Sequence, residues 1–243
     1  MLTSMTAREE ASAASFWWNA QGSWVEPANR RRGGESGVQR LELDSGAYYI
    51  KRQTNHLFRS LRYPGGRPTL LREWHNLRIC KRLGIPTPAV VCFDMRRSHA
   101  AWQALLVTKA LDGYVSLQSG LAAGYWSRAD LARILGRIIS AIAPLHLARR
   151  KHGHLYPKEV FVLPHASREQ IAFVDLEVSR RVATRRHAAR ADMRRLCRSL
   201  LELGLDESLL WSALEQYRAH GIDLPRDRLI SPPALPRLSP NRR

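Results

Sequence analysis

The fold is decided by the stretch from residue 152 to residue 177. It begins His152-Gly-His-Leu-Tyr-Pro-Lys-Glu-Val-Phe-Val and, after a short polar break, ends Ile171-Ala-Phe-Val-Asp-Leu-Glu177. The pattern predicts a polar loop, an apolar strand, a turn and a second apolar strand that ends on Asp175. A carboxylate is costly to bury alone after an apolar run, so Asp175 is expected to meet a metal ion or another cation. The predicted hairpin is suited to holding a metal and a phosphate.

The composition indicates a globular protein with anionic partners. The chain has 243 residues, 44% of them hydrophobic, which is enough for a well-buried core in one domain or one two-lobed domain. Its net charge of +18 favours nucleic acid, phosphorylated small molecules or an anionic membrane surface as partners. The separate cysteines Cys80, Cys92 and Cys197 indicate neither a disulfide framework nor a thiolate zinc site, so a reducing compartment is expected. The longest apolar stretch, residues 138–148, is too short to span a bilayer.

The residues before position 111 predict a small, mostly antiparallel sheet that carries one helix. Strand-like runs alternate with turn formers, and a helix-compatible run ends at Gly84. The predicted elements are a basic glycine-bearing turn at 30–37, strands at 38–43, 47–52, 90–95 and 102–108, a loop at 56–68 and a helix at 69–83.

From Ser127 onward the pattern becomes helical. Leucines and isoleucines recur every three or four residues up to Leu145, which predicts a long amphipathic helix that leads into the opening stretch. Two further helices are predicted at 188–203 and 207–220. The expected domains are a disordered N-terminus at 1–15, an N-lobe at 16–110, a helical C-lobe at 111–224 and a proline-rich basic tail at 225–243.

The order of these parts is more specific than any one of them. Along the chain come a glycine-rich hairpin, a strand lysine, a helix glutamate, a long helix, a His-Gly-x-Leu-x-Pro loop, a strand-terminal aspartate and a helix with an early aspartate. The parts of the protein-kinase fold come in this order. We therefore predict an α+β, bilobal protein-kinase-like fold, with a small antiparallel-sheet N-lobe that carries one helix and a mainly helical C-lobe.

Six short runs carry a family resemblance: Arg32–Val38, Tyr48–Gln53, Arg72–Leu77, Gly84–Pro88, Gly153–Lys158 and Phe173–Glu177. Together they resemble the lipopolysaccharide kinase family of the Kdo/heptose kinase type, in its InaA-like branch, over about residues 16 to 220. The resemblance implies ATP-dependent phosphorylation of a sugar of the lipopolysaccharide inner core. It also implies a cytoplasmic protein that works peripherally at the inner membrane.

The resemblance assigns nucleotide-binding roles in the N-lobe. Lys51 matches the strand lysine that grips the α- and β-phosphates, and Glu73 matches the helix glutamate that holds this lysine. Gly33, Gly34 and Gly37 would let backbone N–H groups approach phosphate oxygens. The structural alternatives are a solvated lysine, an exposed helix acid and a plain hairpin loop.

The opening loop departs from the family's pattern. Aligned on His-Arg-Asp-Leu-x-x-x-Asn, His152 takes the first place, His154 stands where the catalytic Asp is expected, and Glu159 stands where the metal-binding Asn is expected. Histidine accepts a proton near neutral pH, since its ordinary pKa is about 6.5. The expected roles are therefore His154 as base, Glu159 and Asp175 as Mg²⁺ ligands, and Asp192 as a brace for the loop backbone. The open alternative is a catalytically impaired pseudokinase that binds or senses at the membrane.

Two basic clusters suit an anionic partner. They are expected to face anionic lipid headgroups or an anionic sugar acceptor such as the lipopolysaccharide core, and the alternative is a solvated basic face. They comprise Arg59, Arg62, Arg67, Arg72, Arg180, Arg181, Arg185 and Arg186. Nucleic acid ranks last among the partners because no recognised binding motif appears in the sequence. The spacing of His146, His152 and His154 does not match a zinc site. A monomer or weak dimer is expected.

Overall fold

The computed structural model describes residues 14–31, 34–99, 101–164, 170–225 and 229. Most of the predicted N-terminal segment and C-terminal tail, together with Gly33, lie outside these residues. The chain divides into two compact units. The first unit comprises Met1–Tyr114 and Ala172–Ser179, and the second comprises Val115–Ile171 and Arg180–Arg243. The segment around Asp175 thus belongs to the first unit although it follows most of the second in sequence.

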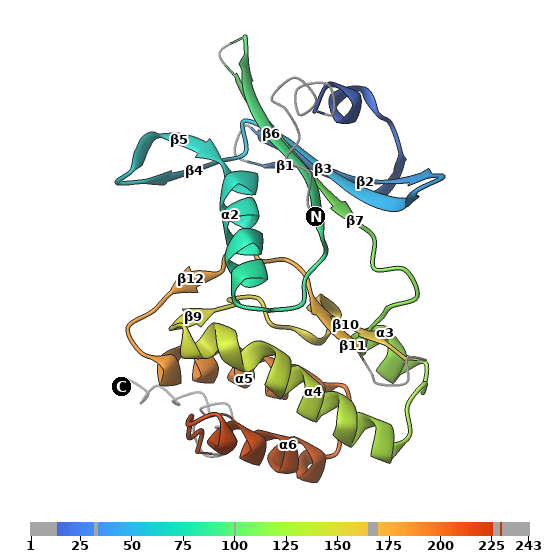
Figure 1. Ribbon diagram of the computed structural model, residues 1–243, viewed down its shortest axis with the longest axis vertical. Coiled ribbons are helices and arrows are strands. Elements are labelled where there is room, and N and C mark those ends of the chain that lie inside the picture. The colour runs from blue at the N-terminus through green and yellow to red at the C-terminus, as the bar shows by residue number, and fades with distance from the viewer. Residues whose placement is uncertain (1–13, 32–33, 100, 165–169, 226–228, 230–243) are drawn as a thin grey trace, which may run out of the picture. The chain divides into compact units, whose positions relative to one another are not determined.

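The first unit contains a five-stranded antiparallel sheet of order β1-β2-β3-β7-β6 (Figure 1). Its strands are β1 (Ser23–Arg31), β2 (Gly34–Leu43), β3 (Gly46–Thr54), β6 (Val90–Ser98) and β7 (Ala101–Lys109). Tyr48 and Ile50 of β3 pack with Leu105 and Val107 of β7 and with Trp17 from a short helix at 14–19. Side chains alternate across a strand, so this packing of residues 48 and 50 leaves Lys51 on the other face of the sheet.

The glycine-bearing turn is shorter than the sequence predicts. Residues 30–37 were expected to form one turn, but β1 continues to Arg31 and β2 begins at Gly34. Gly37 pairs with Arg52 in the middle of the β2–β3 ladder. The reason is that β2 pairs with β3 from Glu35 to Leu43 and with β1 as far as Gly34, and this backbone pairing overrides the local turn preference of the glycines.

Helix α2 (Thr69–Arg82) follows a hairpin of β4 (Leu57–Ser60) and β5 (Tyr63–Pro68), where the sequence predicts a loop (Figure 1). The predicted loop at 56–68 is wrong. These residues lack the alternation of apolar and polar side chains that is typical of a strand, but contacts between aromatic and cationic side chains stabilise the strand pairing instead. Phe58 and Tyr63 meet edge to face with ring centroids 6.0 Å apart. The guanidinium of Arg67 lies over the rings of Tyr63 and Trp102.

The second unit is mainly helical, as predicted. Its elements are β8 (Val115–Ser116), α3 (Leu117–Ala122), α4 (Arg128–Leu147), β9 (Arg150–Lys151), the 3₁₀ helix η1 (Pro157–Glu159), β10 (Val160–Leu163), β12 (Arg180–Arg181), α5 (Arg185–Glu202) and α6 (Glu207–Ala219). A further strand, β11 (Gln170–Phe173), crosses into the first unit and neighbours β10, which in turn pairs with β8. Ser127 and Asp130 form a capping box at the start of α4, which fixes the predicted helix start.

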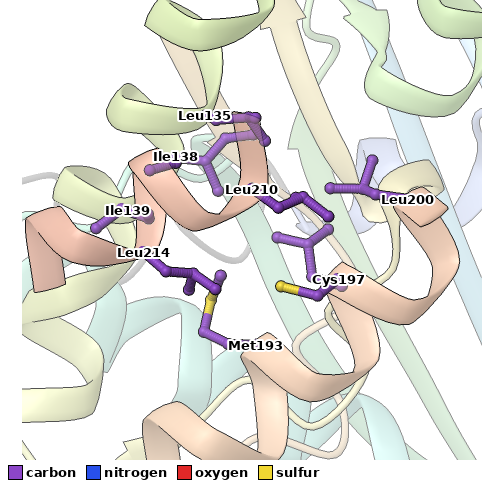
Figure 2. Close-up of a pocket in the computed structure, with 10 residues that line it drawn as sticks. Leu135, Ile138, Ile139, Met193, Cys197, Leu200, Leu210 and Leu214 are labelled. Carbon is purple, nitrogen blue, oxygen red and sulfur yellow. The ribbon is translucent and has the colours of Figure 1, made fainter. Parts of the chain in front are cut away.

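Apolar side chains of α4, α5 and α6 form the core of the second unit (Figure 2). Leu135 and Ile139 of α4, Met193 of α5 and Leu214 of α6 line a remaining cavity of only about 10 Å³. The helices are therefore close-packed, and they give a rigid support to the loop that begins at His152 and precedes α5. Within the described residues, the apolar stretches of the helices are too short or too interrupted to cross a membrane.

Candidate active site

In the first unit, Lys51 of β3 and Glu73 of α2 form an ion pair. The Lys51 Nζ lies 2.6 Å from the Glu73 Oε1, and the two side chains are 29% and 7% exposed. Burial opposes the charged form of Lys51, but the charge and hydrogen bond of Glu73, with the charges of Asp175 and Glu177, raise its pKa above the ordinary value. Lys51 is therefore a fixed cation at neutral pH.

Asp175 is positioned by the backbone of the segment that follows β11. The Phe173 N–H donates to the carbonyl of Pro86 at 2.9 Å. The Asn76 Nδ2 of α2 donates to the carbonyls of Leu176 and Ser179 at 2.7 and 3.0 Å. Between these anchors Asp175 adopts a left-handed backbone with φ of 57°. Such a conformation is unfavourable for a non-glycine residue and persists where the surroundings enforce it, often at functional sites.

Glu177 is a third carboxylate near Lys51, and it was not among the predicted site residues. Burial, followed by the negative charges of Glu73 and Asp175, raises the pKa of Glu177. The sequence signal was a second carboxylate only two residues after Asp175. The charges of three carboxylates act on the Lys51 ammonium group, and the excess of negative charge suits a hard divalent cation.

This charge set fits Mg²⁺ bound together with a nucleotide. Among the residues that the structure describes, no group of three His, Cys, Asp or Glu side chains is arranged to hold a metal ion. Mg²⁺ commonly uses only one or two carboxylates and takes its other ligands from substrate phosphates and water. Asp175 as a ligand is consistent with that mode of binding.

Gly34 and Gly37 have packing reasons to be glycine. A Cβ atom on Gly34 would lie 2.6 Å from the carbonyl oxygen of Asn55, and one on Gly37 would lie 2.5 Å from the ring of Trp24. Both distances are shorter than van der Waals contact. Close packing alone therefore accounts for these two glycines, and their approach to phosphate stays a prediction.

In the second unit, Asp192 of α5 holds the backbone of the opening loop. Its carboxylate accepts hydrogen bonds from the N–H groups of His152 at 2.5 Å and Gly153 at 2.9 Å. The same carboxylate lies 3.0 Å from the His146 Nε2, and the His146 Nδ1 lies 2.9 Å from the Tyr217 hydroxyl. Because protein partners occupy both ring nitrogens of His146, this residue is not a metal ligand.

The electrostatics of this network favour an ionised Asp192. Burial opposes the ionised form, but the hydrogen bond and charge of His146 and the Gly153 N–H lower the pKa of Asp192 below its ordinary value. Burial and the charge of Asp192 raise the pKa of Tyr217 well above its ordinary value. The loop is thus fixed by a buried carboxylate whose hydrogen bonds are satisfied.

His154 and Glu159 lie on the loop that Asp192 fixes. The His154 side chain is exposed, so a substrate hydroxyl can reach it. Its N–H donates to the His152 Nδ1 at 3.3 Å, and its carbonyl accepts from the Tyr156 N–H at 2.8 Å. Glu159 ends η1, and its carboxylate lies 3.4 Å from the Lys158 Nζ. Of the predicted site residues, the first unit thus contains Lys51, Glu73 and Asp175. The second unit contains His152, His154, Glu159 and Asp192.

Comparison with solved structures defines the class of fold. The chain superposes on the structure titled "WaaP in complex with acyl carrier protein" with a TM-score of 0.63 and 20% sequence identity. The match covers 87% of this chain and 82% of the other. The predicted α+β, protein-kinase-like fold is confirmed.

Comparison of the sequence identifies the family. Residues 15–217 match the model of the lipopolysaccharide kinase (Kdo/WaaP) family. The chain is 37% identical to protein InaA of Escherichia coli (strain K12) over 185 residues, which is 75% of this chain and 85% of InaA. The chain belongs to the lipopolysaccharide kinase (Kdo/WaaP) family, which confirms the resemblance noted in the sequence.

Proposed function

We propose that this protein is an ATP-dependent kinase that phosphorylates a sugar hydroxyl of the lipopolysaccharide inner core. The observation that carries the proposal is the Lys51–Glu73 ion pair, with the charges of Asp175 and Glu177 also raising the pKa of Lys51. A fixed cation beside surplus carboxylates suits the phosphates of ATP together with Mg²⁺. Membership of the lipopolysaccharide kinase family supports a phosphotransferase with this class of acceptor.

The chemistry assigns one role to each residue. The oxygen of the sugar hydroxyl forms a bond to the γ-phosphorus while the bond from that phosphorus to the β–γ bridging oxygen breaks, and ADP leaves. His154 accepts the hydroxyl proton, and Lys51 neutralises charge on the α- and β-phosphates. Mg²⁺, held by Asp175 and Glu159, would neutralise phosphate charge. Asp192 positions the loop that carries His154 and does not touch the substrate.

We also propose that the protein works at the cytoplasmic face of the inner membrane through peripheral contact. The β4–β5 hairpin supports this location, because Leu61 at its turn is fully exposed and Leu57 is 39% exposed. Arg59 and Arg62 flank Leu61 and are exposed as well. An apolar tip between two cations suits the boundary between acyl chains and anionic headgroups.

A second candidate function is that of a pseudokinase that binds nucleotide or lipopolysaccharide without transferring phosphate. One observation favours it: His154 stands at the position of the catalytic aspartate. In this case the buried Asp192 network preserves the shape of the loop, while the exposed imidazole accepts no proton from a substrate.

Nucleotide binding and phosphate transfer test the two candidates in turn. ATP with Mg²⁺ is titrated into the full chain by calorimetry, and transfer of labelled γ-phosphate to purified inner-core lipopolysaccharide is then followed. We expect wild type to bind and transfer, and Lys51→Ala, Asp175→Ala and His154→Ala each to lose transfer, with Lys109→Ala as an exposed lysine control. Absence of nucleotide binding by wild type would overturn the kinase. Binding without transfer would select the pseudokinase. Undiminished transfer by His154→Ala would remove histidine from the role of base.

A further inference from the structure

A groove on α5 in the second unit is lined by arginines. Its volume is about 320 Å³, which reaches the lower range of ligand pockets, about 300–1,000 Å³. Its lining residues are Tyr156, Ala191, Arg194, Arg195, Arg198, Ser199 and Glu202. The proposed phosphate transfer assigns no role to these arginines.

The charge of the groove favours an anion. Three arginines line it against one acid, Glu202. Arg194 and Arg198 are four residues apart on one helix, where two like charges repel each other and destabilise the helix unless an anion lies between them. The arrangement therefore has a physical reason if a ligand supplies the missing negative charge.

Arg195 adds a buried donor at the same place. Its Nη1 atom is buried and has no hydrogen-bond partner among the residues that the structure describes. The Asp192 Oδ1 lies 3.9 Å away, too far for a hydrogen bond, and that oxygen already accepts the Gly153 N–H. An unsatisfied buried donor is costly, particularly on a charged group. The Nη1 atom itself faces Asp192, while the Arg195 side chain is 30% exposed and lines the groove. The exposed edge of its planar guanidinium is suited to binding a carboxylate or phosphate.

The groove adjoins the loop that carries the proposed base. The Arg195 guanidinium carbon lies 5.3 Å from the centre of the Tyr156 ring, and this ring is 6.3 Å from the ring of His154. The Tyr156 N–H also donates to the His154 carbonyl. A molecule anchored on the arginines would therefore extend past Tyr156 to the imidazole.

We infer that this groove binds an oxyanion substituent, a phosphate or a carboxylate, of the acceptor sugar and presents a hydroxyl of that sugar to His154. The presentation of a sugar hydroxyl to His154 rests on the proposed kinase function. Binding of the oxyanion requires only the groove. Arg194, Arg195 and Arg198 are the anion-binding residues, and they select an anionic sugar over a neutral one.

Binding of three sugars to the full chain at low salt tests the inference. The probes are glucose 6-phosphate, glucuronate and neutral glucose, titrated by calorimetry. We expect one or both anionic sugars to bind and glucose to bind at least about tenfold more weakly, since a hydrogen bond to a charged group contributes about 1.5–3 kcal/mol. The arms with phosphate and carboxylate show which oxyanion the groove prefers. Equal binding of glucose, or no binding of either anionic sugar, would overturn the inference.

Matched variants locate the binding on α5. Arg194→Gln and Arg198→Gln are each expected to weaken the anionic sugar about tenfold. Arg137→Gln, an exposed position on α4 outside the groove, should change affinity less than about twofold, which is the effect of one distant exposed charge. Arg195→Lys retains the charge and loses the planar fork, so it separates guanidinium geometry from charge. Equal losses in Arg137→Gln and Arg198→Gln would reduce the binding to nonspecific attraction.

A readout at His154 separates this inference from the proposed function. The anionic sugar should shift the NMR signals of the His154 imidazole in wild type and in Lys51→Ala, and the shift should disappear in Arg198→Gln. Sugar binding without nucleotide binding would defeat the kinase proposal and leave the groove intact. Nucleotide binding without any shift at His154 would defeat the groove as an acceptor site and leave the kinase proposal intact.

Discussion

The two units differ in how closely they follow the protein-kinase pattern. The first unit has the strand lysine, the helix glutamate and the aspartate after β11, with the ion pair formed at 2.6 Å. The second unit has the bracing aspartate, but its loop carries His154 and Glu159 where the kinase pattern leads us to expect an aspartate and an asparagine. Phosphates of ATP impose the same chemistry on every kinase, whereas the acceptor differs. Of the two departures, His154 would serve the acceptor, while Glu159 would still offer an oxygen ligand to Mg²⁺.

The units also differ in how they bury charge. Lys51 remains 29% exposed and has more carboxylates near it than one cation neutralises. Asp192 is fully buried and has protein partners for both oxygens. The first arrangement is suited to an incoming cation, and the second is complete in itself. We therefore expect changes at Lys51 to act on function and changes at Asp192 to act on stability.

The largest effect is expected for Asp192→Ala. The change leaves the His152 and Gly153 N–H groups and the buried His146 without their acceptor, so the free energy of unfolding should fall by about 3–5 kcal/mol. Urea denaturation measures this loss. Asp223→Ala is the control, since its ion pair with Arg218 is exposed and should contribute less than about 1 kcal/mol. Similar losses in both variants would contradict a structural role for the Asp192 network.

A smaller effect on stability, but a large one on activity, is expected at Lys51. Lys51→Met leaves Glu73 buried without its partner and should lower both the free energy of unfolding and phosphate transfer. The double variant Lys51→Met/Glu73→Gln removes both charges and should recover most of the stability, because a neutral pair needs no compensation. Transfer should remain about 10²–10³-fold below wild type in both variants, the usual effect of removing one group that stabilises the transition state. Recovery of transfer in the double variant would show that the pair is only structural.

The sequence predicts the fold correctly where the hydrophobic pattern is regular. The leucine and isoleucine repeat of α4 and its capping residues Ser127 and Asp130 fix that helix locally. The β4–β5 hairpin was missed because β5 reads Tyr-Pro-Gly-Gly-Arg-Pro, a typical turn composition. Stacking of arginines on aromatic rings stabilises it instead, and this depends on cross-strand contacts that a binary pattern does not encode.

The candidate site was predictable where the order of motifs defined it. Lys51 and Glu73 are 22 residues apart and were paired by their places on a strand and the next helix. The groove on α5 was not predictable, because Arg195 meets Tyr156 only through the packing of α5 against the loop. Glu177 lay in the quoted stretch, but its effect depends on tertiary proximity to Glu73.

A moderate effect is expected for the tip of the β4–β5 hairpin. If this hairpin enters the membrane surface, Leu61→Ser should weaken binding to vesicles that contain anionic phospholipid by about tenfold, since burying one leucine contributes about 1.5–3 kcal/mol. Flotation of the full chain with such vesicles measures the change. Leu203→Ser, an exposed leucine of the second unit, is the control. Equal binding of both variants would exclude the hairpin as the membrane contact.

The smallest effect is expected in the pH dependence of stability, because the two units contribute with opposite signs. The lowered pKa of Asp192 adds stability that is present above its ordinary value of 3.8 and is lost as the pH falls through the folded pKa. The raised pKa of Glu177 does the reverse, since the folded state binds a proton first, and stability rises as the pH falls through the folded pKa toward 4.5.

Comparison of variants separates these two contributions. In urea denaturation between about pH 2.5 and 6.5, Glu177→Gln should remove the rise above pH 4.5 and leave the fall below pH 3.8. Asp192→Asn should remove part of the fall and leave the rise. The remaining acid loss is expected from exposed carboxylates with lowered pKa values, such as Asp206 with a pKa of about 2. If Glu177→Gln instead made the protein less stable at neutral pH, Glu177 would be a favourable partner of Lys51, and the surplus of negative charge in the first unit would not exist.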